Sequence, residues 1–574
     1  MRIKSFAINN FRGITGGLDK NIINFDDSNT IFVFGQNNVG KSSILKAYES
    51  FYLDSITEKD LCNSNSDDIE IEIEFYIDEA TDKSVIEAKG GNKYKNLKNK
   101  YLNDRGVLKL KKTFSRTDRT SSNQTFNIAM NDYENISYGG IGSHGPFKSM
   151  MLQPLYIKAM PTEADVESIV TDLLKEIATS RLKDSERAEL KAAEETIEKL
   201  QAAIYKTSDR ETYTNEVNEK FGRLFNGFKL HIDEGNSKAK FTQDKVGKDF
   251  KVTFKTVRDG EDVFSDYDQM GHGSVRIAIF LLMLMRDKLR GDEEVKKNFL
   301  VLFEEPELFL HPVLTKELRS LIYDVSDKET PFQVLCASHS PQMIDISKDH
   351  SSLVRMVKTE SSTYLYQIQQ DDLKNSEQDT KAKVKQKLYE ILRFDPYVCE
   401  SFYASEVLLV EGDTEAIIAR GFQQEFEETK NIFVVNCHSV TNIPFYQRFF
   451  SKFKIPYSVI CDTDSEDGPD KGWNSDSENP IFTGGIQKSI LDQFTTDKEA
   501  GAAKHFFVFD NTFETPHAGL ENPFKYAGNV SDGKPFNANA YWNQLLAAKA
   551  EGNEDGFNEV PIVNYLRKIM LKGE

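Results

Sequence analysis

Residues 30–43 read T-I-F-V-F-G-Q-N-N-V-G-K-S-S, an apolar run followed by the pattern G-x-x-x-x-G-K-[ST]. In this pattern the glycines let the backbone wrap around a phosphate, and successive N–H groups and the next helix's N-terminus point at the anion. Lys41 is expected to reach the β- and γ-phosphates, and Ser42 to place its hydroxyl on a bridging Mg²⁺. The stretch predicts a strand, a phosphate-binding loop and a helix, with candidate ligand-binding residues Gly35, Asn37, Asn38, Gly40, Lys41, Ser42 and Ser43.

Composition limits the class of protein. With 574 residues, the chain is long enough for several domains, and 39% hydrophobic with 28% charged residues is ordinary for a soluble globular protein. A net charge of −19 argues against coating nucleic acid by bulk attraction, but leaves contacts through local basic patches or bound metal ions. The five cysteines are widely spaced, so neither a zinc ribbon nor a disulfide framework is expected. No run suits a signal peptide or membrane span, which predicts a cytoplasmic protein without membrane contact.

Two further segments belong with the phosphate loop. Phe299–Phe303 is five apolar residues long and predicts a buried parallel strand, with Glu304 and Glu305 at its carboxyl end, where ligands sit in open α/β sheets. One carboxylate can hold Mg²⁺ while the next orients the attacking water. A second apolar strand is predicted at 332–337, and it places His339 at the same sheet edge as a γ-phosphate contact.

These elements, in this order, resemble an ABC-type ATPase as found in SMC and RecF-like proteins. The resemblance assigns Lys41 and Ser42 to Walker A, Glu304 and Glu305 to Walker B, and His339 to the switch histidine. It also implies that the loop before the apolar helix 275–285 is a degenerate signature loop, which in that family contacts the ATP of the opposite subunit. The chain departs from the family by having Glu304 where aspartate is usual and by lacking L-S-G-G-Q. The signature residues are then Gly271, Gly273 and Ser274, and Gln153 is a candidate metal-sensing glutamine.

A second set of acids appears in the C-terminal part. Short apolar strands are predicted at 406–410, 431–435 and 456–461. Glu411 and Glu415 follow the first strand one helical turn apart, and Asp462 and Asp464 follow the third on one side of its end. Parallel strands would bring the four carboxylates together, and oxygen ligands of this kind select Mg²⁺ or Mn²⁺. Such a site can activate water for phosphodiester cleavage.

The C-terminal part resembles a Toprim domain, and an ABC ATPase followed by Toprim resembles the OLD (overcoming lysogenisation defect) family of nucleases. That resemblance implies nuclease activity on DNA, a homodimer or higher oligomer formed through the ATPase part, and a role in bacterial defence against phage. In OLD proteins another acid and a lysine complete the site. Glu514 is the best match to the acid and Lys534 to the lysine, while Lys568 and Lys572 remain competitors.

Composition and periodicity divide the chain. Residues 68–77 alternate strictly, with isoleucine or phenylalanine on one face and Glu70, Glu72 and Glu74 on the other, which predicts a half-buried antiparallel strand. Weaker alternation recurs at Leu108–Leu110 and Phe126–Met130. Residues 166–177 and the short heptads of 190–204 predict a helical insert. The predicted parts are an ATPase N-terminal part (1–161), a helical dimerisation insert (162–228), an ATPase C-terminal part (229–375), a linker with a basic helix (376–400) and a Toprim nuclease domain (401–574).

One basic run stands out in this acidic chain. Lys89–Lys112 contains nine basic residues against one acid, with Tyr94 and Tyr101 between them. It is a candidate contact for a DNA backbone and stacked bases. The alternative is a solvated strand edge whose lysines discourage aggregation. A regulatory protein or small nucleic acid is a further candidate partner for the same run.

The α/β fold class, with an ABC-type ATPase, a helical insert and a Toprim domain, supports one leading hypothesis. It is an ATP-regulated, Mg²⁺- or Mn²⁺-dependent DNA endonuclease, in which Glu305, Glu411, Asp462 and Lys534 are catalytic and Ser42, Glu304, Glu411, Glu415, Asp462, Asp464 and Glu514 hold metal. Two rivals are an ATP-driven DNA-binding scaffold with a non-catalytic Toprim part and a nuclease acting on RNA. A topoisomerase or primase would need a nucleophilic tyrosine domain or zinc-binding cysteines, and neither is evident.

Overall fold

The computed structural model describes most of the chain. The described residues are 1–26, 28–62, 67–87, 93–140, 146–162, 164–171, 207–224, 228–234, 250–258, 261–265, 271–285, 299–326, 332–346, 350–360, 362–369, 372–373, 381–394, 398–426, 429, 431–465, 476–477, 479–528 and 530–572. Two compact units divide the chain, one of Met1–Met343 with Met356–Leu365 and one of Ile344–Arg355 with Tyr366–Glu574. The borders predicted after residues 161, 228, 375 and 400 stay predictions, and the polar linker 375–380 lies outside the described residues.

An antiparallel sheet forms one layer of the first unit. Its strand order is β2-β1-β4-β5-β6-β7. The strict alternation of residues 68–77 is confirmed, since every second residue of β4 is buried. Ile128 and Met130 fall beyond the end of β6 and are 39% and 63% exposed, so the weaker pattern there does not continue the strand. The elements of this layer are β1 (Arg2–Asn9), β2 (Ile22–Asn24), β4 (Ile69–Tyr76), α2 (Glu79–Glu87), α3 (Lys93–Lys100), β5 (Val107–Phe114), β6 (Ser121–Asn127), β7 (Asp132–Glu134) and α4 (Pro146–Met150).

The sheet that carries the phosphate loop has the order β15-β14-β3-β13-β12-β8. Four adjacent strands of it, β3, β13, β12 and β8, pair in parallel, as apolar strands with polar residues at their carboxyl ends are expected to do. The helices α1 and α10 both pack on these strands. The elements are β3 (Thr30–Phe34), α1 (Lys41–Leu53), β8 (Gln153–Ile157), β12 (Phe299–Glu304), α10 (Pro312–Ser326), β13 (Phe332–Ala337), β14 (Leu353–Lys358) and β15 (Thr363–Gln367).

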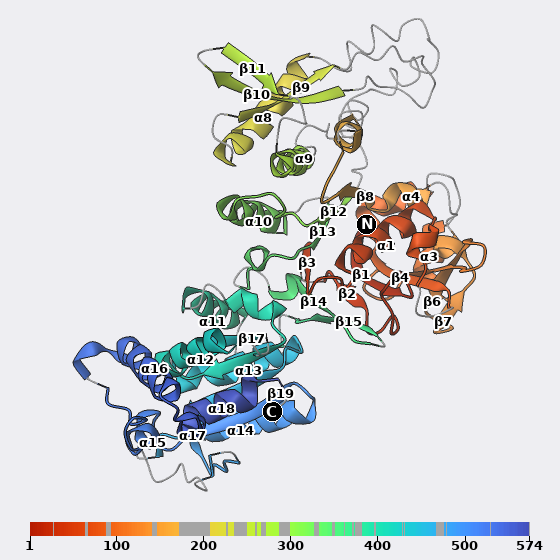
Figure 1. Ribbon diagram of the computed structural model, residues 1–574. Helices are drawn as coiled ribbons and strands as arrows, with labels where there is room; N and C mark the ends of the chain where they lie inside the picture. The colour runs from red at the N-terminus through yellow and green to blue at the C-terminus, as the bar shows by residue number, and fades with distance from the viewer. Residues whose placement is uncertain are drawn as a thin grey trace, which may run out of the picture. The chain divides into compact units, whose positions relative to one another are not determined.

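A helical segment and a small sheet complete the first unit. Val166 and Val170 lie on the buried face predicted for the insert, whereas Leu173, Ile177 and the heptads of 190–204 lie outside the described residues. An antiparallel sheet β11-β10-β9 packs beside α8 (Figure 1) and has no counterpart among the predicted elements. The elements are α8 (Thr207–Leu224), β9 (Phe228–Glu234), β10 (Phe250–Arg258), β11 (Glu261–Ser265) and α9 (His272–Met285).

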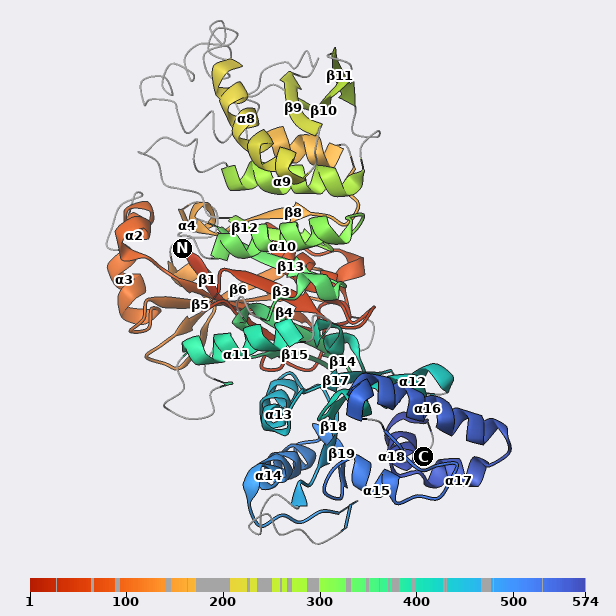
Figure 2. The ribbon, with the colours of Figure 1, turned by 90° about the vertical axis from the view of Figure 1, so that its left-hand side faces the viewer.

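The second unit is built on a parallel sheet of order β17-β16-β18-β19. Figure 2 shows α12, α16 and α18 on one side of these strands and α13 and α14 on the other. The first side is an aromatic-rich core that includes Phe422, Phe507, Trp542 and Tyr565. The elements are α11 (Lys381–Phe394), β16 (Glu406–Val410), α12 (Asp413–Glu425), β17 (Ile432–Asn436), α13 (Ile443–Lys452), β18 (Tyr457–Asp462), α14 (Gly485–Glu499), β19 (Ala503–Phe509), α15 (Glu514–Ala518), α16 (Lys534–Ala550), α17 (Glu554–Glu559) and α18 (Pro561–Met570).

The predicted strands at 406–410, 431–435 and 456–461 correspond to β16, β17 and β18, and the basic helix before them to α11. Among the described helices, none is both long and apolar enough to cross a membrane.

Candidate functional site

The loop between β3 and α1 folds as the glycine pattern requires. Gly35 has φ 152°, and a Cβ atom there would lie 2.3 Å from the carbonyl oxygen of Met356. Gly40, which precedes the first turn of α1, has φ 106°, and Asn38 also has a positive φ of 64°. A side chain at Gly35 would clash with the Met356 carbonyl, and the positive φ of Gly40 is one that residues with a side chain rarely adopt. Both positions therefore depend on glycine. The loop has the concave shape that cradles a phosphate.

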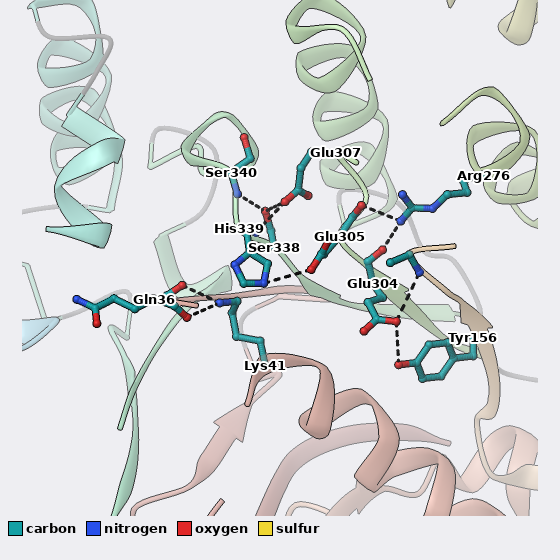
Figure 3. A network of polar contacts seen from close by, with 12 residues as sticks. Gln36, Lys41, Tyr156, Arg276, Glu304, Glu305, Glu307, Ser338, His339 and Ser340 are labelled. Carbon is teal, nitrogen blue, oxygen red and sulfur yellow. Dashed lines mark hydrogen bonds and ion pairs between the residues drawn. The ribbon is translucent and has the colours of Figure 1, made fainter. Parts of the chain in front are cut away.

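Lys41, the first residue of α1, turns its side chain back into the loop. Its Nζ atom donates hydrogen bonds of 2.7 Å to the carbonyl oxygen of Gly35 and 2.8 Å to that of Gln36 (Figure 3). Burial lowers the pKa of Lys41 to about 8, while the nearby carboxylates of Glu305 and Glu307 oppose that shift. The ammonium group is therefore held in a polar, partly dehydrated position where a phosphate oxygen would be a strong partner.

One cavity of about 650 Å³ brings the nucleotide elements together. Six of the seven predicted loop residues line it together with Glu305 and His339, whereas the predicted residues Gly35 and Glu304 are not among its lining residues. The cavity is of a size that suits a small-molecule ligand. Its lining residues are Asn37, Asn38, Gly40, Lys41, Ser42, Ser43, Glu305 and His339.

Glu305 and His339 are in contact with each other in the lining of this cavity. The Nε2 atom of His339 lies 3.3 Å from a carboxylate oxygen of Glu305. Glu305 has a left-handed backbone conformation with φ 44°, and its amide donates a 2.7 Å hydrogen bond to the carbonyl oxygen of Ala337. Burial, together with the charge of Lys41, lowers the pKa of His339. The imidazole is therefore neutral near pH 7, able to donate from one nitrogen and accept at the other.

Glu304 is the last residue of β12 and turns away from His339 toward β8 (Figure 3). One of its carboxylate oxygens accepts weak hydrogen bonds from the Tyr156 hydroxyl at 3.4 Å and the Ala159 amide at 3.5 Å. Gln153 does not approach Glu304, because it pairs with Phe299 at the opposite end of the parallel strands. Five residues of strand separate the two ends by about 16 Å, so the expectation that Gln153 senses the metal was wrong.

Two residues that organise this site were missed from the sequence. The Glu307 carboxylate accepts hydrogen bonds from the Ser338 hydroxyl at 3.0 Å and the His339 amide at 2.7 Å, and so fixes the turn that carries the histidine. The guanidinium of Arg276 is fully buried and donates to the carbonyl oxygens of Glu304 and Glu305, the latter at 2.8 Å (Figure 3). The third glutamate of E-E-P-E was the visible signal for Glu307. No local pattern marks Arg276.

The predicted signature residues occupy the start of α9. Gly271 is exposed, and a Cβ atom there would meet nothing within 4 Å. Gly273 is buried, and its Cβ would come within 2.6 Å of Leu310 Cδ2 and 2.9 Å of the Phe309 carbonyl oxygen. Neither glycine nor Ser274 lines the cavity. Their contact with a nucleotide of another subunit stays a prediction.

The second candidate site lies at the carboxyl ends of β16 and β18. Glu411, Asp462 and Asp464 each offer a carboxylate oxygen, and these atoms all lie within 4.8 Å of one another. Glu411 follows β16 directly, while Asp462 ends β18. Asp464 has φ 47° and is held by its amide, which donates 2.8 Å to the carbonyl oxygen of Asn511, and by Gln487, whose side-chain amide donates 2.8 Å to its carboxylate.

The electrostatics of this cluster suit a cation. Burial and the charges of Glu415 and Glu411 raise the pKa of Asp462 to about 9, and burial raises that of Glu411. The Asp462 Oδ1 atom is buried without a hydrogen-bond partner. A buried, orphaned carboxylate oxygen among like charges is costly unless a cation completes it. The donor set, all oxygen, fits Mg²⁺ or Mn²⁺.

The remaining predicted residues surround the cluster without joining it. Glu415 is 4% exposed and accepts a hydrogen bond from the Gly412 amide at 3.2 Å, which caps the start of α12. Burial raises the pKa of Glu415 to about 7, and the charges of Glu411 and Glu514 add to that shift. Lys534 begins α16, and its positive charge opposes the rise at both Glu411 and Glu415, so it lies near them. Lys568 instead lies over the Phe507 ring, at 5.8 Å.

The basic run is divided by the fold. Its lysines on β5 pair within the unit: Lys109 with Glu72 at 2.8 Å and Lys111 with Glu70 at 3.6 Å. Lys112 is buried, with Asp54 as its ion-pair partner. The helix α3 presents Lys95 and Lys100 to solvent, while residues 88–92 lie outside the described residues. The strand part of the run does not form the solvated edge of the alternative interpretation, because β5 lies between β4 and β6 and its lysines are paired with acids.

Taken together, the geometry defines a P-loop ATPase unit and a unit with a parallel sheet and a carboxylate cluster of Toprim type. The chain belongs to the AAA ATPase domain family, whose model matches residues 1–344, more than half of the chain. A second model, described as the TOPRIM domain of overcoming lysogenization defect protein-like proteins, matches residues 402–464 and so includes Glu411, Glu415, Asp462 and Asp464. The predicted fold class and the resemblance to the OLD family are confirmed by these matches.

Two curated relatives are named as OLD nucleases. The Old nuclease of Escherichia phage P2 is 27% identical over 203 residues, which cover 35% of this chain and 32% of that protein. The OLD nuclease of Thermus scotoductus is 27% identical over 168 residues, which cover 29% of this chain and 30% of that protein. The chain thus spans about a third of the length of the curated relatives that it matches.

Solved structures with detectable similarity include an SMC head domain from Thermotoga maritima and a RecF–ATP structure. The first is 10% identical with a TM-score of 0.33, covering 64% of this chain and 100% of that one. The second is 14% identical with a TM-score of 0.34, covering 64% of this chain and 98% of that one. These TM-scores are too low to argue from.

Proposed function

We propose that this chain is an ATP-regulated, divalent-metal-dependent DNA endonuclease. The observation that carries the proposal is the cluster of Glu411, Asp462 and Asp464 at the carboxyl ends of two parallel strands, with Lys534 near it. The names of the relatives and the OLD-like TOPRIM match support the same activity. In this proposal, ATP bound by the ATPase unit regulates the nuclease activity.

In the ATPase unit, the chain's own groups have separable roles. The loop amides and Lys41 would bind the phosphates, and Ser42, which lines the cavity, would hold Mg²⁺ together with Glu304. Glu305, with a carboxylate oxygen 3.3 Å from His339 Nε2, orients the water that attacks the γ-phosphate. The single N–H of the neutral His339 ring would donate a hydrogen bond to that phosphate.

In the nuclease unit, Glu411, Asp462 and Asp464 would hold the divalent ions, with Glu415 and Glu514 next to them. The bound ions would activate water and stabilise the leaving 3′ oxygen. The charge of Lys534 would stabilise negative charge that develops on the phosphate. Gln487 and the Asn511 carbonyl fix Asp464 before any ion arrives.

The decisive experiment incubates purified protein with supercoiled plasmid, single-stranded DNA or tRNA, with Mg²⁺ or Mn²⁺, with and without ATP. We expect metal-dependent cleavage of DNA that Asp462→Ala abolishes and that Lys41→Ala uncouples from ATP. Asp492→Ala is the matched control, since Asp492 is an exposed acid on α14 paired with Lys488 at 2.7 Å. If Asp462→Ala cleaves like wild type, the nuclease assignment fails. If only tRNA is cut, the substrate is RNA.

We also propose that the ATPase unit forms a homodimer and that the protein acts in defence against phage. Phe309, which is 57% exposed and packs against His272 of α9, and Val313 of α10, which is 61% exposed, offer apolar side chains to a second copy. The matching TOPRIM model is described as overcoming lysogenization defect protein-like, which supports the defence role. Sedimentation with and without ATP tests the dimer. Plaque counts on cells that express wild type, Lys41→Ala or Asp462→Ala test the defence role, which fails if all three strains are equally sensitive.

A further inference from the structure

A basic pocket lies in the second unit between α11, α13 and α14. Its volume is about 640 Å³. Three cationic side chains line it, Lys383 and Lys387 from α11 and Arg448 from α13. None of the described residues that line it carries a carboxylate, although the whole chain has 91 acidic against 72 basic residues. Three cations in one concave surface create a local positive potential that attracts anions.

Two of the three cations contact other side chains of the protein. The Nζ atom of Lys387 donates a 2.7 Å hydrogen bond to the side-chain oxygen of Asn442. Asn442 in turn donates 2.8 Å to the carbonyl oxygen of Cys437, which directly follows β17. The guanidinium carbon of Arg448 lies 6.0 Å from the centre of the Phe445 ring, another lining residue. Little side-chain freedom is then lost when an anion binds, which favours affinity.

Two residues that line the pocket are next in sequence to residues that bond to the carboxylate cluster. Thr441 lines the pocket, and the backbone N–H of the preceding residue, Val440, donates a hydrogen bond to the Glu411 carboxylate. On the α14 side Ile486 lines the pocket, and the next residue, Gln487, donates to Asp464 at 2.8 Å. An anionic chain lying in the pocket would therefore continue to the residues that are proposed to hold the metal.

We infer that this pocket binds the phosphodiester backbone of the nucleic-acid strand that is cut, beside the scissile phosphate. The inference rests on the proposed nuclease function and names the substrate contacts of that same site. Lys383, Lys387 and Arg448 contact successive phosphates, and sequence-independent contacts of this kind fix the register of the strand. The phosphates of the strand and the nearby carboxylates repel each other, and the cations of the pocket offset that repulsion.

The test uses the full chain with Lys387→Gln and Arg448→Gln combined. A fluorescent single-stranded oligonucleotide measures affinity in EDTA, and cleavage with Mn²⁺ gives kcat and KM. We expect the Kd and KM to rise about 10-fold or more, and the slope of log K against log salt to fall in magnitude by about 1.4, which is roughly 0.7 for each lost contact to a single strand. The value of kcat at saturating DNA and the rate of ATP hydrolysis should stay within twofold of wild type.

The control is Lys488→Gln with Lys498→Gln, two lysines of α14 outside the pocket. Lys383→Gln, at an exposed side chain, should raise the Kd by itself and guards against a folding defect in the double variant. If wild type cleaves, Asp462→Ala does not, and the pocket variants match the control in KM and salt slope, the inference is wrong while the nuclease stands. If ADP or inorganic phosphate displaces the oligonucleotide as well as unlabelled oligonucleotide does, the pocket is a small-anion site and the inference is also wrong.

Discussion

The backbone amide of Asp462 donates a 3.1 Å hydrogen bond to a carboxylate oxygen of Glu411. This bond joins the ends of β16 and β18 through two of the three residues that converge on the cluster. The bond orients the Glu411 carboxylate but supplies no positive charge. The three carboxylates are therefore held close together with no cation to balance their charge. The cost of that arrangement is lost stability without a cation.

Asp462→Asn is therefore expected to separate stability from activity. Because its pKa is raised to about 9, the Asp462 carboxyl must take up a proton when the unit folds at neutral pH without a cation, a cost that the neutral asparagine lacks. The melting temperature in EDTA should therefore rise by a few degrees, because about 1 kcal/mol corresponds to roughly 2–4 °C for a unit of this size. Cleavage should fall at least about 100-fold, and the stabilisation by Mn²⁺ should shrink. Differential scanning calorimetry in EDTA and in Mn²⁺ checks this. An unchanged Mn²⁺ shift in Asp462→Asn, with Asp492→Asn as control, would remove Asp462 from the ligand set.

Arg276 is expected to support ATP hydrolysis without touching the nucleotide. Its buried guanidinium binds the carbonyl oxygens of Glu304 and Glu305, so it sets the backbone that aims the Glu305 carboxylate. Arg276→Lys should lower kcat about 10-fold, because one charge-assisted hydrogen bond contributes about 1.5–3 kcal/mol, while KM for ATP stays near wild type.

The matched control for Arg276 is Arg319→Lys on α10. Arg319 also donates to a backbone carbonyl, that of Gln342 at 2.9 Å, but it does not line the nucleotide cavity. Steady-state ATPase assays, with nucleotide affinity measured separately, distinguish the two. Equal kcat values for both variants would show that Arg276 has no positioning role.

The sequence predicted the parts of both sites that are local. Glycines, lysine and acids at the ends of short apolar runs placed the phosphate loop, Glu305, His339, Glu411 and Asp462, because parallel strands end at one edge. The sequence did not predict contacts between residues that are far apart along the chain. Arg276 reaches residues 28 and 29 positions away, and Gln487 reaches Asp464 across 23 positions, with no periodicity to signal either. The prediction for Gln153 was wrong for the same reason, because only the register of β8 against β12 shows which end of β8 lies near Glu304.

The basic run should bind DNA through α3 and not through β5. Lys95 and Lys100 are exposed, whereas Lys109 and Lys111 are paired with glutamates of β4. Lys95→Glu with Lys100→Glu should weaken binding of duplex DNA several-fold and reduce the salt slope by about 2, from roughly 0.9 per contact. Lys109→Gln with Lys111→Gln is the comparison and should leave the slope unchanged. Identical salt titrations for both pairs would remove the run as a DNA contact.

His517 is expected to make the second unit sensitive to mild acid. The ring is fully buried, and its Nε2 atom accepts a 3.2 Å hydrogen bond from the Ile562 amide, so the proton of the neutral ring is on Nδ1, 2.6 Å from the Phe513 carbonyl oxygen. Protonation would place an N–H against the Ile562 N–H. Burial lowers the pKa of His517 from 6.5 to about 4.

The sign follows from the proton balance. Between pH 6.5 and 4 the unfolded chain binds a proton at His517 that the folded chain does not, so the free energy of unfolding falls as the pH falls through that window. Between pH 7.5 and 5 the loss should be about 2 kcal/mol. Urea unfolding followed by tryptophan fluorescence reports on this unit through Trp542, which is buried in its core. His517→Gln should lower stability at pH 7.5 yet lose about 2 kcal/mol less than wild type on going to pH 5. His505→Gln, at a partly exposed position on β19, should keep the wild-type slope. Equal pH slopes for wild type and His517→Gln would show that His517 does not carry the acid sensitivity.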